Sequence, residues 1–261
     1  MSLVLYKTHL IPDLNTRPVD LKFEVMGDHF SIANTIKLEN SDKELGQLPD
    51  RRAARAMGRS SLLLSAVGLQ TQEILSSFIK KDCYRVGLYC AIDNGPDDYQ
   101  CIQALMNTNE SEFATIYKKN RSPKQYLKQL PNLAGAQLGI FLGIQGPLNV
   151  FIHSQYGPLH ALEQAEFDLN NNLIDAALVC AAFSLEDPLL CHRVRKDYPG
   201  EAVLTEGAAA LVLVSGGEKK NWSELTSNVG NISTSKRIYG IADLLINYCI
   251  GGDKNERTSI I

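Results

Sequence analysis

The sequence has no marked excess of charge and no long apolar run. Its 26 basic and 29 acidic residues give a net charge of −3, which offers no electrostatic attraction for nucleic acid or an anionic membrane. No stretch is apolar over the length of a bilayer-spanning helix, and the first residues lack the basic and apolar regions of a secretion signal. We therefore expect a cytoplasmic protein with no nucleic-acid partner and no membrane partner.

Disulfide and metal-binding patterns are also missing. None of the six cysteines lies in a C-x-x-C pair, and Cys90 and Cys180 stand inside apolar, strand-like runs. This usage is typical of reduced, buried thiols rather than of disulfides or zinc ligands. The sequence predicts no metal site and no cofactor.

What the sequence does contain is an alternation of apolar strands and helices. Its 261 residues, 44% of them hydrophobic, are enough for a sizeable core. We expect one α/β domain over residues 1–261 with a mainly parallel or mixed sheet, ending in a disordered tail at 251–261. Residues 3–50 look polar and irregular apart from a hairpin. The expected elements are the hairpin at 19–36, helices at 51–79, 99–106, 158–171 and 240–250, strands at 85–92, 175–182 and 206–214, and a short strand before Gln155.

Gln155 lies in the most informative stretch of the chain. Residues 146–162 are typical of an apolar strand, a tight turn and an amphipathic helix. Enzymes place nucleophiles on such turns because a helix N-terminus stabilises a thiolate or an oxyanion. A glutamine amide cannot attack a carbonyl and only donates and accepts hydrogen bonds. If this is a nucleophile turn, its nucleophile is absent.

Two histidines flank this turn. His153 precedes it with no acidic residue close in sequence, and His160 lies three residues before Glu163 in the following helix. That spacing is common on helix surfaces and needs no catalytic meaning. We interpret both histidines as packing or interface residues, with a catalytic role as the alternative.

From Arg51 to Val214 the chain resembles the N-terminal half of a β-ketoacyl synthase, a thiolase-fold condensing enzyme. The resemblance rests on four segments in order: 142–147, 160–165, 175–179 and 206–213. It implies an α/β, thiolase-like fold and puts Gln155 at the position of the catalytic cysteine. Chain length factors, the non-condensing partners in type II polyketide synthases, typically carry glutamine there, and this chain is similar to them. Loading domains of modular synthases, which decarboxylate malonyl units, share that glutamine.

The C-terminal part departs from the family pattern. The family's H-G-T-G-T run is absent, and no histidine follows His192. The family's K-S-x-x-G-H run corresponds best to residues 236–241, where Lys236 keeps the lysine and Ile241 replaces the histidine. The final glycine-rich segment is also missing. The resemblance therefore implies an N-terminal half with a reduced C-terminal half, lacking both catalytic imidazoles.

The resemblance also implies partners. It predicts a heterodimer, or a higher assembly, with an active ketosynthase subunit that extends a polyketide on an acyl carrier protein. The growing polyketide chain would enter a tunnel at the dimer interface. The residues expected to line or block this tunnel are Leu127, Gln129, Leu130 and Leu133.

Other interpretations remain open at this point. Each of these leucines is equally consistent with ordinary core or interface packing. The chain as a whole is also consistent with a malonyl-carrier decarboxylase that acts through Gln155. A third interpretation is a purely structural scaffold for the ketosynthase.

Overall fold

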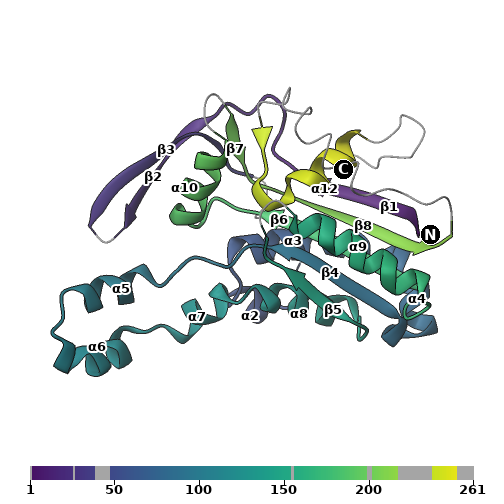
Figure 1. Cartoon of the computed structure of the whole chain (residues 1–261), viewed down its shortest axis with the longest axis horizontal. Helices are drawn as coiled ribbons and strands as arrows, with labels where there is room; N and C mark the ends of the chain where they lie inside the picture. The colour runs from purple at the N-terminus through teal and green to yellow at the C-terminus, as the bar shows by residue number, and fades with distance from the viewer. Residues whose placement is uncertain are drawn as a thin grey trace.

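A computed structural model describes residues 2–25, 27–38, 48–153, 156–198, 202–216 and 237–251. Its main sheet has five strands in the order β1-β8-β6-β4-β5 (Figure 1). The three strands β6, β4 and β5 run parallel, whereas β8 is antiparallel to β6, and β1 is antiparallel to β8. The strands are β1 (Ser2–Leu10), β4 (Val86–Ile92), β5 (Leu148–Phe151), β6 (Ala176–Phe183) and β8 (Gly207–Ser215).

Helices cover both faces of this sheet. Every residue of β4 and of β6 is buried, as expected for strands packed on both sides. Alternate residues divide between two cores, so that Tyr89 and Ala91 face α9 while Leu88 and Cys90 face α3 and α8. The helices on the sheet are α3 (Arg59–Leu69) and α8 (Pro131–Leu142) on one face, with α9 (Gly157–Asn170) and α12 (Asp243–Gly251) on the other. The predicted mixed α/β sheet is confirmed.

A smaller sheet of four strands lies beside the main one, in the order β2-β3-β7-β9. It begins with the predicted hairpin, in which Phe23 stacks on Phe30 at a centroid distance of 5.5 Å. Its strands are β2 (Val19–Val25), β3 (Asp28–Ile36), β7 (Val203–Thr205) and β9 (Arg237–Ile238). Helix α10 (Pro188–Asp197) follows β6 and begins at the N-cap Asp187.

Two predictions about the first eighty residues were wrong. Residues 2–10 are not irregular, because they form β1 at the edge of the main sheet, where buried Val4 alternates with exposed Leu3 and Leu5. The expected helix over 51–79 is three helices, since Gly58 is extended and Thr71 turns its hydroxyl back to the Gly68 carbonyl. These helices are α2 (Arg51–Ala54), α3, and α4 (Gln72–Lys81). The structure also adds α10, β7 and β9, which the sequence pattern did not predict.

The cysteines behave largely as expected. All six are free, five are buried, and Cys83 is half-buried. Burial raises the pKa of Cys191 and of Cys249 to about 12, so both are neutral thiols near neutral pH. No single helix in the described ranges is long and apolar enough to cross a membrane. Helices α3 and α4 reach that length only as a pair, and they meet at 74°.

An arm of the chain, residues 97–130, projects from the body at the carboxyl end of β4 (Figure 1). Its outgoing and returning stretches are tied together by hydrogen bonds from Ser122 N–H to Asp98 (3.0 Å) and from Gln125 Nε2 to the Pro96 carbonyl (2.8 Å). A Cβ on Gly95 would overlap the Lys128 carbonyl oxygen, at 1.9 Å, so only glycine allows this close approach. The arm contains α5 (Tyr99–Met106), η2 (Glu110–Glu112), α6 (Phe113–Asn120) and α7 (Pro123–Gln129).

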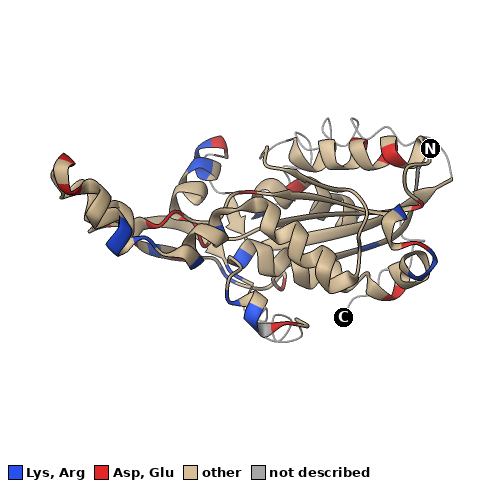
Figure 2. Ribbon diagram, turned by 90° about the horizontal axis from the view of Figure 1, so that it is seen from below, with Lys and Arg blue, Asp and Glu red and all other residues tan. Residues whose placement is uncertain are grey.

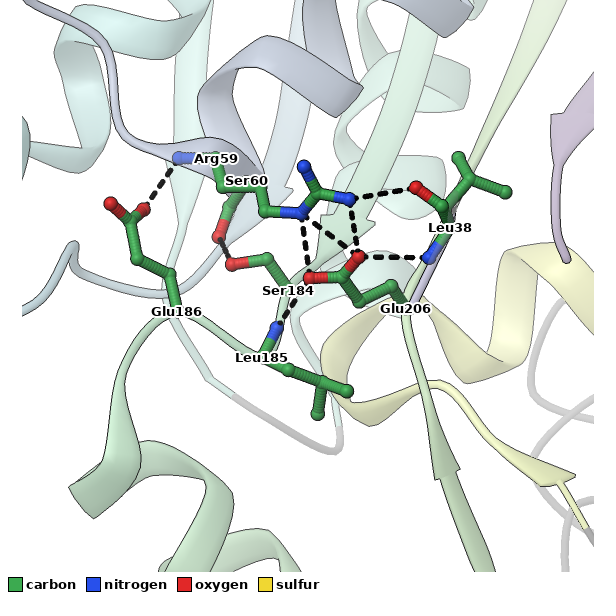
Figure 3. A network of polar contacts seen from close by, with 7 residues as sticks. All are labelled: Leu38, Arg59, Ser60, Ser184, Leu185, Glu186 and Glu206. Carbon is green, nitrogen blue, oxygen red and sulfur yellow. Dashed lines mark hydrogen bonds and ion pairs between the residues drawn. The ribbon is translucent and has the colours of Figure 1, made fainter. Parts of the chain in front are cut away.

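A buried ion pair joins the start of α3 to the start of β8 (Figure 3). The Arg59 guanidinium contacts both carboxylate oxygens of Glu206, with Nη2 at 2.7 Å from Oε2 and Nε at 2.7 Å from Oε1. The same carboxylate accepts hydrogen bonds from the backbone N–H groups of Leu38 and Leu185, each at 3.0 Å. Glu206 is fully buried, and its negative charge is compensated by the Arg59 cation and by the two backbone N–H groups.

The loop that follows β6 continues this network. The Glu186 carboxylate accepts from the Arg59 backbone N–H at 2.6 Å, and the hydroxyls of Ser60 and Ser184 lie 2.8 Å apart. Lys128, at the base of the arm, lies 3.7 Å from Glu186. The loop 184–187 therefore connects the ion pair to α3 and to the arm.

Replacing one partner of this pair should be costly. In Glu206→Gln the Arg59 charge loses its counter-ion inside the protein, so we expect the free energy of unfolding in urea to fall by about 3–5 kcal/mol. Lys81→Met is the matched control, because Lys81 is 72% exposed where it pairs with Asp175. That substitution should cost less than about 1 kcal/mol. Equal, small losses in both variants would contradict a central role for Arg59 and Glu206.

Candidate functional site

The turn between β5 and α9 is the candidate site. Ser154 and Gln155 lie outside the described residues, so the structure describes only the two ends of the turn. At those ends the N–H of Gly157 donates to the His153 carbonyl at 2.7 Å, and the N–H of Tyr156 donates to His153 Nδ1 at 3.3 Å. Helix α9 starts at Gly157 and carries Pro158 in its first turn. The predicted sequence of strand, turn and helix is confirmed in the described part.

Four rings surround the start of α9. His160 lies 6.3 Å from Phe151, 6.4 Å from His153 and 6.3 Å from Tyr156, measured between ring centroids. His153 also contacts Tyr156 at 5.2 Å. Both imidazoles are exposed and pack on neighbouring rings. This arrangement agrees with their interpretation as packing or interface residues.

The segment after β9 reaches the same place. A Cβ on Gly157 would lie 3.3 Å from Cδ1 of Ile241 and 3.6 Å from Cβ of Ala91, so Ile241 packs against the first turn of α9. Ile241 belongs to η3 (Gly240–Ala242) and is 1% exposed. The sequence resemblance assigned Ile241 to the position of a family histidine, and an aliphatic side chain there cannot donate a hydrogen bond. Lys236, the other residue of that alignment, lies outside the described residues.

Asp243 fixes the position of η3. Its Oδ1 accepts from the Tyr239 N–H and its Oδ2 from the Asn247 amide, each at 3.0 Å. Burial raises the pKa of Asp243 to about 6, and these two hydrogen bonds oppose part of that shift. Gly240 has φ of +50°, and a Cβ there would overlap the Phe183 ring. Glycine and the buried aspartate together hold Ile241 on α9.

Asp93 is a buried carboxylate that the sequence did not single out, since it read as the end of a strand. It follows β4, is 5% exposed, and lies 3.5 Å from Nη2 of Arg193 on α10. Its Oδ2 is buried and has no hydrogen-bond partner among the residues that the structure describes. Burial raises the pKa of Asp93 to about 6, with Asp187 adding to the shift and Arg193 opposing it.

The four residues predicted to line a tunnel lie where the arm returns to the body. Leu127 and Gln129 belong to the last turn of α7, Leu130 is the N-cap of α8, and Leu133 lies in the first turn of α8. Leu127 is 39% exposed, whereas Leu130 and Leu133 are half-buried. The Gln129 side chain donates from Nε2 to Asp97 at 3.1 Å. Their role in a tunnel stays a prediction.

Within the described ranges, no group of three or more His, Cys, Asp or Glu side chains is placed to hold a metal ion.

Comparison with known proteins gives a result only at the level of structure. No protein-family model matches the sequence, and no curated protein matches it either. A type II polyketide synthase acyl-carrier protein in complex with its ketosynthase (AntDE:AntF) matches with a TM-score of 0.55 and 20% identity, over 69% of this chain and 53% of that one. A β-ketoacyl synthase from Burkholderia phymatum gives 0.57 and 14%, over 82% and 58%.

A third structure, the ketosynthase ApeO with its chain length factor ApeC from Xenorhabdus doucetiae, gives a TM-score of 0.57 and 11% identity, over 83% of this chain and 58% of that one. The chain thus spans between half and three-fifths of the length of these proteins. At such low identity the likeness shows the fold alone. The protein has a thiolase-like, ketosynthase-type α/β fold, as the sequence resemblance predicted.

Contact between Ile241 and Gly157 can be tested by a double-mutant cycle. Gly157→Ala should be destabilising because the new methyl crowds Cδ1 of Ile241, and Ile241→Val removes that carbon. We expect a coupling of about 0.5–1 kcal/mol in the free energy of unfolding, so that Gly157→Ala costs less in the valine background. Gly139→Ala is the control, since its Cβ would meet nothing closer than 3.6 Å. Full additivity at Gly157 and Ile241 would contradict the packing described.

Proposed function

We propose that this chain is a non-condensing chain length factor, which pairs with an active ketosynthase and shapes the tunnel for a polyketide built on an acyl carrier protein. The observation that carries the proposal is Gln155, which precedes the start of α9 by two residues in a ketosynthase-type fold. Decarboxylative condensation needs a thiolate to carry the acyl chain and donors for the developing negative charge. Glutamine supplies no nucleophile, and Ile241 supplies no donor.

The edge of the main sheet supports a partner subunit. Strand β5 is the last strand of the sheet and pairs only with β4 in the described part of the chain. An edge strand presents unpaired N–H and C=O groups that a second chain can bind. Leu148 in β5 is 41% exposed, and Ile152 and Tyr156 beside it are also exposed. In the family that the chain resembles, thiolase-fold subunits pair through the edges of their sheets and the neighbouring helices, and one similar structure is a ketosynthase with its chain length factor.

The arm supports contact with an acidic protein. Between Phe113 and Leu130 the chain has five basic residues and no acidic one, and among the described residues only Lys128 of these five is paired with a carboxylate. Figure 2 shows the basic segments along the returning part of the arm. The cations with no carboxylate partner in the described part of the chain are Lys118, Lys119, Lys124 and Arg121, whose guanidinium lies over the Tyr117 ring. Such a surface complements the acidic helix of an acyl carrier protein, and one similar structure contains a carrier protein with its ketosynthase.

The leucines at the base of the arm suit a role in limiting chain length. Leu127 presents an exposed apolar side chain, and Leu130 and Leu133 are half-buried near the point where α7 meets α8. In an assembled tunnel, bulky side chains here would exclude further carbon units, because overpacking costs about 1–3 kcal/mol. These leucines, with Gln129, would form the distal wall of that tunnel.

A charge on β5 should prevent assembly. Leu148→Lys puts an ammonium at the sheet edge that the partner would cover, so we expect loss of co-purification with a co-expressed type II ketosynthase subunit. Leu3→Lys is the control, because Leu3 is 44% exposed on β1, the opposite edge of the sheet, against 41% for Leu148. Size-exclusion chromatography of the co-expressed pair measures the complex. Equal loss in both variants, or in neither, would argue against pairing through β5.

Activity of the isolated chain separates this function from decarboxylation. We expect no acetyl-carrier when the chain alone is incubated with malonyl-carrier, and mass spectrometry of the carrier measures it. Acetyl-carrier that forms with the wild-type chain and is lost in Gln155→Ala would favour the decarboxylase instead.

Product length tests the role of the arm. In the assembled complex, Leu127→Ala and Leu130→Ala should lengthen the polyketide by one or more extension units, because each substitution removes bulk from the tunnel wall. Tyr126→Ala, at an exposed neighbouring position, should leave product length unchanged. Liquid chromatography with mass spectrometry measures the products. Unchanged lengths in both leucine variants, with an intact complex, would favour a structural scaffold.

A further inference from the structure

The root of the arm contains a buried charge that is poorly compensated. Asp93 lies between the end of β4 and the first residue of the arm, and it is 5% exposed. Its Oδ1 is 3.5 Å from Arg193, longer than an ordinary charged hydrogen bond, and its Oδ2 has no hydrogen-bond partner within the described residues. A buried carboxylate in this state is costly, and protonation removes that cost.

The groups around Asp93 also hold the arm. Helix α10 contributes Arg193 and, at its N-cap, Asp187, the two charged groups that act on Asp93. Of the other elements that contact β4, η3, α8, β5 and β6 have no charged residue, whereas α9 carries His160, Glu163, Glu166 and Asp168. Asp187 accepts a hydrogen bond from the hydroxyl of Tyr99 at 2.7 Å, and Tyr99 is the first residue of α5. The bond between Asp187 and Tyr99 therefore tethers the arm to α10, and the negative charge of Asp187 acts on Asp93.

We propose that Asp93 is a proton-operated switch at the root of the arm. When Asp93 takes up a proton, the repulsion between Asp93 and Asp187 disappears and the tether between Asp187 and Tyr99 is stabilised. When Asp93 loses the proton, the buried negative charge favours opening of the root, which exposes Asp93 to water. The switch belongs to this chain and does not depend on the proposed function. If that function holds, the segment that it loosens carries Leu127 and Gln129.

The direction of the pH dependence follows from linkage. The pKa of Asp93 is about 6 in the closed root and returns to the ordinary 3.8 when the root opens. The closed root therefore binds the proton more tightly, so its stabilisation is complete at low pH and is lost as the pH rises through 6. Between about pH 5 and about pH 7.5, the equilibrium constant for opening should rise about tenfold.

Amide hydrogen exchange of the full chain tests the switch. After correction for intrinsic exchange rates, protection of residues 97–130 should fall about tenfold from about pH 5 to about pH 7.5, relative to β6 and β8 as internal references. In Asp93→Asn this difference should vanish, with protection staying high at the upper pH. Glu73→Gln, at an exposed position on α4 and away from the arm, should keep the wild-type behaviour.

Arg193→Gln provides a second, independent measurement. Arg193 is 64% exposed, so this variant should fold, and loss of its positive charge should move the transition to higher pH. A wild-type pH dependence in Asp93→Asn would overturn the proposal. If Asp93→Asn does not fold, an unmoved transition in Arg193→Gln would overturn it alone.

Discussion

The buried ion pair of Arg59 and Glu206 is the constraint on which the rest of the architecture depends. Glu206 stands directly before β8, and its carboxylate reaches the start of α3, the residue that follows β3 by two positions, and the loop after β6. One side chain thus fixes the relative positions of the main sheet, the smaller sheet and a core helix. Such a pair contributes little net stability, because removing both charges from water offsets most of their attraction. We interpret its value as specificity, since few other arrangements would satisfy a fully buried carboxylate.

The loop 184–187 connects this ion pair to the arm at the carboxyl end of the parallel strands. Its backbone binds Glu206 through Leu185, and its side chains bind Arg59, Lys128 and Tyr99. Two of the attachments between the arm and the body therefore come from one short loop. The arm is long and its own helices bury few residues, so these attachments contribute strongly to its position. A change of charge beside the loop, as at Asp93, acts on the whole arm.

Strands buried on both faces were predictable from the sequence, whereas the partly exposed edge strand β1 was not. Strands β4, β6 and β8 are continuous apolar runs, because helices cover both sides of the sheet. Strand β1 escaped prediction because Lys7, Thr8 and His9 interrupt its pattern, although Lys7 and Thr8 are buried in the fold. Helices α3 and α4 were predicted as parts of one helix, because the spacing of apolar residues alone does not show where a helix is interrupted.

The candidate site was predictable only where its residues are consecutive. The turn at Gln155 follows from local sequence, since an apolar strand, a turn and an amphipathic helix are each short-range signals. The packing of Ile241 on Gly157 joins segments 84 residues apart, as 241 − 157 gives, and no local pattern encodes that contact. Asp93 and Arg193 are 100 residues apart, so their pairing was equally invisible. Sequence resemblance supplied the position of Ile241, and only the fold supplied Asp93.

The tight packing at the start of α9 and the absence of a polar donor at position 241 have the same physical origin. A histidine at position 241 would bring a polar ring to the start of α9, and such a ring needs partners when it is buried. Isoleucine needs none, is 1% exposed, and joins the core that packs α9 on the sheet. The fold therefore keeps its packing without the groups that condensation requires. Three surface features are not buried in the core: the edge of the sheet at β5, the basic stretch of the arm and the leucines at its base. On the function proposed above, all three would serve as surfaces for binding, and a partner subunit would supply the thiolate.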